Sequence, residues 1–134
     1  MKTKRTKLGA LVIAALLSVF AAGINAQSLK RISFARGENS AVVKGTTGPY
    51  GTTYVLRVRS GQKMVITVTP AAAVGIKIET NGRFGRQVLL RSEAGGTHEV
   101  GIEESGDHTI FIGPIEGKPV SFRLTVNITK LADI

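Results

Sequence analysis

The stretch that decides the fold is YVLRVRSGQKMVITV, residues 54–68, and a second informative stretch is SGDHTIFI, residues 105–112. In the first stretch, apolar residues occupy every second position from Tyr54 to Val58 and again from Met64 to Val68. Strand side chains point alternately to the two faces of a sheet, so this pattern gives each segment one apolar face and one polar face. Both stretches therefore predict β-strands with one buried face.

The rest of the chain after residue 27 shows weaker versions of the same pattern. Further strands are predicted near residues 32–34, 40–44, 76–79, 87–90, 98–102 and 122–129. The segment Ser60-Gly61-Gln62 predicts a short hairpin connection, and Asn81-Gly82 predicts a turn. Short strands at this spacing are typical of a sandwich. The sequence therefore predicts an all-β fold, an antiparallel β-sandwich that is jelly-roll-like and has seven to nine short strands.

Residues 1–26 have the three-part layout of a secretory signal peptide. A basic head containing Lys2 and Arg5 precedes the apolar segment 8–22, and the small residue Ala26 precedes Gln27. The alternative is a retained anchor, but this apolar run is shorter than the ~20 residues that span a bilayer. We expect cleavage after Ala26, a single β-sandwich domain over residues 27–134, a periplasmic or secreted location, and no stable membrane insertion.

Composition excludes several classes of function. Four of the 18 basic residues lie in the predicted signal peptide, which leaves 14 basic and nine acidic residues and a formal charge of +5. The basic residues are scattered, so we expect no nucleic-acid partner. The chain has no cysteine and two histidines. We therefore expect no disulfide, no metal site and no cofactor.

No catalytic constellation is visible in the sequence. Ser105, Asp107 and His108 are near neighbours on one predicted turn, so they cannot line up as nucleophile, orienting acid and base. The acidic pair Glu103-Glu104, taken together with Asp107, matches no recognised calcium loop. The sequence therefore predicts a protein that is not an enzyme.

The motifs resemble those of two related families of bacterial exported domains. The segments 54–58, 61–66, 105–107 and 122–126 resemble the pre-peptidase C-terminal domains that accompany secreted peptidases. The opening segment ISFARGENSA, residues 32–41, is similar to the start of the periplasmic inhibitors of g-type lysozyme. This resemblance implies a sandwich fold and a loop that enters a lysozyme cleft. The loop would be Ser105 to His108, with His108 in place of the tyrosine of the family pattern SGxY.

Candidate partner-binding residues lie in predicted loops. They are Ser105, Gly106, His108, Tyr50, Arg83 and Arg86. Each has a structural alternative. Ser-Gly-Asp is a common turn sequence. His108 is an even number of residues from Ile110, which is expected to face the core, so its side chain could also point inward. Tyr50 could pack over the end of the sandwich, and the arginines could simply be solvated.

Two functions of different classes follow from these observations. The first is an exported, non-enzymatic binding protein whose end loops, 105–108 and 48–51, occlude the cleft of a protein partner such as a lysozyme. The alternative is a carbohydrate- or cell-surface-binding accessory module, although the chain has few aromatic residues for stacking on sugars. The sequence leaves the oligomeric state open.

Overall fold

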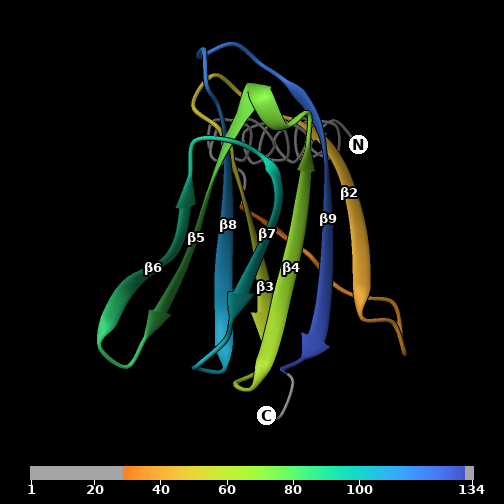
Figure 1. The fold of residues 1–134 in the computed structure, drawn as a ribbon, viewed down its shortest axis with the longest axis vertical. Helices are drawn as coiled ribbons and strands as arrows, with labels where there is room; N and C mark the ends of the chain where they lie inside the picture. Colours follow the sequence, from red (N-terminus) through yellow and green to blue (C-terminus); the bar gives the residue numbers. More distant parts are fainter. Residues whose placement is uncertain (1–28, 132–134) are drawn as a thin grey trace, which may run out of the picture.

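A computed structural model describes residues 29–131 of the chain, so the predicted signal peptide lies outside the described residues. Within this range, nine strands and one short 3-10 helix follow one another (Figure 1). The elements are β1 (Leu29–Arg31), β2 (Ser40–Thr46), β3 (Thr52–Val58), β4 (Gln62–Thr69), η1 (Ala71–Ala73), β5 (Val74–Gly82), β6 (Gly85–Ser92), β7 (Gly96–Gly101), β8 (Gly106–Pro114) and β9 (Ser121–Lys130).

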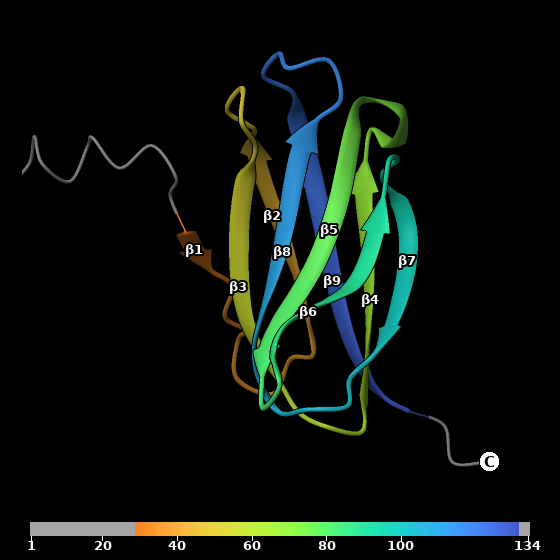
Figure 2. The same cartoon turned by 90° about the vertical axis from the view of Figure 1, so that its left-hand side faces the viewer.

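The strands form two sheets that pack face to face (Figure 2). One sheet has the order β1-β3-β8-β5-β6 and the other has the order β2-β9-β4-β7. The orders 3-8-5-6 and 2-9-4-7 are those of an eight-stranded jelly roll. Strand β1 is added outside β3 and pairs with it in parallel, while the other pairs are antiparallel. The structure thus confirms the predicted all-β, jelly-roll-like sandwich.

The core lies between the two sheets and comes from the alternating positions of each strand. In β3 these positions include Leu56, and in β4 they include Met64 and Ile66, all of which are fully buried. Their polar neighbours point to the outer faces. Because the chain has no cysteine, this apolar core is the main source of stability in the fold.

An aromatic pair closes the core near the start of β3. The ring of Tyr54 meets that of Phe122 edge to face, with centroids 6.1 Å apart and an interplanar angle of 72°, a favoured arrangement for aromatic pairs. Gly45 on β2 makes room for this pair. A Cβ atom at Gly45 would lie 2.8 Å from the Tyr54 hydroxyl and 3.0 Å from the Phe122 ring.

Three local predictions differ from the structure. The segment Ser60-Gly61-Gln62 does not form a hairpin, because β3 and β4 belong to different sheets and the chain crosses the sandwich here. The turn predicted at Asn81-Gly82 falls two residues later, at Arg83-Phe84, and joins β5 to β6. The first strand is Leu29–Arg31 rather than residues 32–34. Ile32 and Phe34 nevertheless pack on the core.

The connections between strands gather at two opposite ends of the sandwich (Figures 1 and 2). We call one the Tyr50 end, formed by the β2–β3, β4–β5, β6–β7 and β8–β9 connections. We call the other the Ser105 end, formed by the β1–β2, β3–β4, β5–β6 and β7–β8 connections. Residues 29–131 contain no helix that is long and apolar enough to cross a membrane.

Candidate partner-binding ends

The Ser105 hydroxyl, which was predicted to bind a partner, is engaged within the protein, as is the neighbouring Glu104 carboxylate. The Ser105 hydroxyl accepts a hydrogen bond from the Ser60 amide (2.9 Å), which links the β7–β8 and β3–β4 connections. The Glu104 carboxylate accepts one from the Arg83 amide at the tip of the β5–β6 hairpin (3.3 Å). A Cβ atom at Gly82 would collide with that carboxylate. These contacts hold three connections together.

Gly106 and His108 begin strand β8, and both have structural roles here. Gly106 has a φ of +139°, a conformation that favours glycine. His108 is 1% exposed, and its Nδ1 lies 3.0 Å from the Gly106 carbonyl oxygen. The imidazole therefore lies inside the sandwich, as its shared parity with Ile110 allowed. It offers no surface to a partner in this structure.

Asp107, between these two residues, forms a two-pronged ion pair with Arg31 of β1. The carboxylate oxygens lie 2.8 and 3.2 Å from the guanidinium nitrogens. The hydrogen bond from Arg31 is the largest influence on the carboxyl group, and together with the nearby positive charges it holds the pKa of Asp107 below its usual range. The pair ties the short edge strand β1 across β3 to β8.

The variant Arg31→Gln is expected to raise the pKa of Asp107 toward its ordinary value, because the main donor to the carboxylate is lost. A depressed carboxyl pKa stabilises the fold above the unfolded-state pKa, and that contribution is lost as the pH falls through the folded-state pKa. Wild type should therefore lose this contribution on acidification, and the variant should lack it throughout. Carbon-13 NMR titration of the Asp107 carboxyl measures the shift. The control Arg123→Gln, on the other sheet, should leave it unchanged.

The other predicted arginines lie apart from each other. Arg83 sits at the hairpin tip beside Phe84, whose side chain is 85% exposed. Arg86 is on the outer face of the five-stranded sheet, with its Nε 3.8 Å from the Glu79 carboxylate. Arg86 therefore belongs to a sheet surface and not to the loop that the sequence suggested.

Tyr50 lies at the opposite end from Ser105, so the two predicted contact loops do not lie side by side. Its side chain is 85% exposed, and it lies within a tight turn closed by the Gly51 amide donating to the Gly48 carbonyl (3.1 Å). The loop is anchored by Thr47, which is buried. The Thr47 amide donates to the Val120 carbonyl (2.9 Å), and the Thr47 hydroxyl accepts from the Val120 amide (3.1 Å).

All four prolines of the chain lie at the Tyr50 end. They are Pro49, Pro70, Pro114 and Pro119. Further backbone hydrogen bonds join the connections there, from Gly95 to Ala71 (2.7 Å) and from Ile115 to Ala73 (3.1 Å). Proline fixes φ, so these loops lose little conformational freedom when they contact a partner.

Shallow hollows with cationic borders surround the Tyr50 end. One hollow, at the edge of the four-stranded sheet, is lined in part by Lys44 and Arg123. Another, on the outer face of the five-stranded sheet, is lined in part by Lys77 and Arg91. None of these four cations is among the binding residues predicted from the sequence, because they come from four different strands and only the topology brings them to one end. Alternation could have placed each on an outer face.

The described part of the chain contains no group of three or more His, Asp or Glu side chains arranged to hold a metal ion. Each end carries one almost fully exposed aromatic ring, Tyr50 at one and Phe84 at the other.

The fold of this chain is similar to that of several solved protein structures. No family model and no curated protein sequence matches the chain. Among solved structures, PliG of Aeromonas hydrophila, a periplasmic lysozyme inhibitor of g-type lysozyme, matches with a TM-score of 0.67 at 21% identity, covering 76% of this chain and 96% of PliG. PliG of Salmonella Typhimurium matches with a TM-score of 0.58 at 20% identity, covering 76% and 98%.

A pre-peptidase C-terminal domain of a Bacillus anthracis collagenase also matches, with a TM-score of 0.46 at 8% identity, covering 77% of this chain and 96% of that domain. The chain thus has the β-sandwich fold of the PliG proteins. The resemblance to the periplasmic inhibitors of g-type lysozyme is confirmed at the level of the fold.

Proposed function

We propose that this protein is an exported, non-enzymatic inhibitor that blocks the cleft of a lysozyme with its Tyr50 end. The observation that carries the proposal is the construction of this end. An aromatic side chain that is almost fully exposed stands on a loop that contains Pro49 and is fixed by a buried threonine. Tyrosine is a frequent contact residue because it combines an apolar ring, a polar tip and few rotatable bonds.

Positive charge also lies beside this end. A glycoside hydrolase cleft contains catalytic carboxyl groups, so an inhibitor that enters it benefits from nearby positive charge. Lys44 and Arg123 border the Tyr50 end on one side, and Lys77 and Arg91 border it on the other. At the Ser105 end, by contrast, the Ser105 hydroxyl and the Glu104 carboxylate already have partners within the protein.

The fold shared with the PliG proteins supports the choice of partner, and the signal-like residues 1–26 support a periplasmic location. Recognition would rest on shape and polar complementarity, without covalent chemistry. The site residues predicted from the sequence divide accordingly. Tyr50 is central to the proposed contact, while Ser105, Gly106 and His108 support the fold.

Lysis assays test the proposed function. Purified protein at micromolar concentration is mixed with g-type, i-type and c-type lysozymes, and the clearing of a cell-wall suspension is followed. We expect inhibition of at least one class, with equimolar stoichiometry. Undiminished lysis by all three classes would remove the proposal. Ser105→Ala should inhibit as wild type does if the Tyr50 end is the contact, and a selective loss in this variant would move the contact to the Ser105 end.

The alternative drawn from the sequence, a carbohydrate- or cell-surface-binding module, is favoured by a separate observation. The hollow on the outer face of the five-stranded sheet combines an aromatic ring with two cations.

A further inference from the structure

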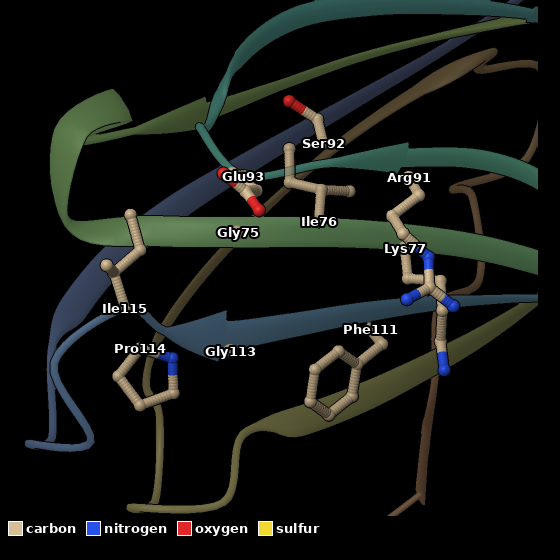
Figure 3. Close-up of a pocket in the computed structure, with 10 residues that line it drawn as sticks. All are labelled: Gly75, Ile76, Lys77, Arg91, Ser92, Glu93, Phe111, Gly113, Pro114 and Ile115. Atoms are coloured by element: carbon tan, nitrogen blue, oxygen red, sulfur yellow. The ribbon is translucent and has the colours of Figure 1, made fainter.

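A hollow of about 570 Å³ opens on the outer face of the five-stranded sheet, near the Tyr50 end (Figure 3). This volume lies within the range of ~300–1,000 Å³ that is usual for small-molecule sites. Its floor includes the backbone of Gly75 of β5, which stands directly opposite Gly113 of β8 in the sheet, while the Phe111 ring lies over Gly113. Phe111, Pro114 and Ile115 form its apolar wall, and Lys77, Arg91 and Glu93 form its polar rim.

The glycines also fix the position of the aromatic wall. A Cβ atom at Gly113 would lie 2.8 Å from the Phe111 ring, and one at Gly51 would collide with the same ring. The ring therefore lies against the backbone of Gly113, two residues further along β8, and against that of Gly51, just before β3. This arrangement presents a fixed aromatic surface beside the glycine floor.

Two cations stand together at one side of the hollow. Lys77 and Arg91 are direct cross-strand partners on β5 and β6, and Figure 3 shows their charged groups lying near each other. The Lys77 ammonium is 5.6 Å from the centroid of the Phe111 ring, within the range of a cation–π contact. It is also 3.5 Å from the Glu79 carboxylate. No carboxylate among residues 29–131 forms a salt bridge with Arg91, so its guanidinium is free to receive an anion.

We propose that this hollow binds an acidic sugar, that is, a pyranose ring that carries a carboxylate. The planar guanidinium of Arg91 would hold the carboxylate through paired hydrogen bonds, with Lys77 adding charge. The apolar face of the sugar ring would lie against Phe111, and Glu93 would accept hydrogen bonds from the hydroxyls. An inorganic anion would leave the aromatic wall unused, and a neutral sugar would leave the two cations unused.

Amide NMR titration of the full-length exported protein tests this site. The probes are methyl β-D-glucuronide, the neutral methyl β-D-glucoside, and acetate. We expect saturable shifts with the glucuronide at Gly75, Lys77, Arg91, Phe111 and Gly113, and much weaker binding of the other two probes. Equal affinity for the glucoside or for acetate would overturn the proposal, as would the absence of saturable shifts with the glucuronide.

Matched variants sharpen the test. Arg91→Ala should weaken glucuronide binding roughly ten-fold or more, the usual effect of losing charge-assisted hydrogen bonds. Arg123→Ala removes the same charge from an exposed site on the other sheet and should leave the affinity unchanged. Equal affinities of the two variants would overturn the assignment of Arg91. The hollow shares Lys77 and Arg91 with the border of the proposed lysozyme contact. The titration measures sugar binding directly, so its result stands whatever the lysis assays show.

Discussion

The variant Tyr50→Ala is expected to weaken lysozyme inhibition by about 30-fold or more. Central aromatic anchors of protein interfaces typically contribute about 2 kcal/mol or more when truncated to alanine, which corresponds to this factor. The side chain is 85% exposed, so its removal costs the fold little. Inhibition constants from lysis assays measure the first effect, and urea denaturation measures the second.

Phe84 provides a matched control for Tyr50. It is also an aromatic residue at a loop tip, its side chain is likewise 85% exposed, and it lies at the Ser105 end of the sandwich. Phe84→Ala should therefore inhibit as wild type does. The reverse result, with loss in Phe84→Ala and none in Tyr50→Ala, would contradict the proposed contact and assign it to the β5–β6 hairpin tip.

The variant Ile110→Ala is expected to lower the free energy of unfolding by about 3 kcal/mol, within the usual range of about 2–5 kcal/mol for such truncations. Ile110 lies in β8, with Tyr54 of β3 and Ile78 of β5 directly opposite it on the two sides. All three are buried, and Ile110 is fully so. Its truncation leaves a cavity in the middle of the sheet, and no disulfide compensates for the loss.

Urea denaturation measures this loss as a lower midpoint with an unchanged slope. Val42→Ala is the control, because Val42 on β2 is 58% exposed, and we expect a change of less than about 1 kcal/mol. Equal losses in the two variants would show that the space between the sheets does not carry the stability.

Alternation in the sequence was sufficient to predict the strands and the layered fold, because it reports directly which side chains are buried. It could not report which strands pair. A strand with one apolar face looks the same whether its neighbour along the chain lies beside it or in the facing sheet. The segment Ser60-Gly61-Gln62 has the composition of a hairpin, yet it crosses the sandwich.

The shifted turn after β5 has a similar cause. Asn-Gly is the strongest local signal for a hairpin turn. Here the strand continues through Asn81 and Gly82, and the turn falls at Arg83 and Phe84. The absence of a side chain at Gly82 instead admits the Glu104 carboxylate from a distant connection. Local chemistry cannot reveal such a contact.

The sequence could indicate whether a single candidate residue is exposed or buried, but not which candidate residues lie together at one end of the sandwich. The exposure of Tyr50 and the inward parity of His108 both follow from position in a loop or a strand. The prediction that loops 48–51 and 105–108 contact one partner together was wrong, because the order of loops along the chain does not show which end of the sandwich each one occupies. Lys44 and Arg123 became relevant only once β2 and β9 were known to pair.

Successive connections alternate between the two ends of the molecule. The two ends are therefore encoded by different segments of the sequence, which alternate along the chain. We expect a longer, shorter or transplanted loop at one end to leave the other end in place, because the two sheets separate them. In such a scaffold the loops at one end can vary in sequence while those at the other end keep the two sheets together. Engineered loops at both ends would give a single chain two unrelated binding specificities.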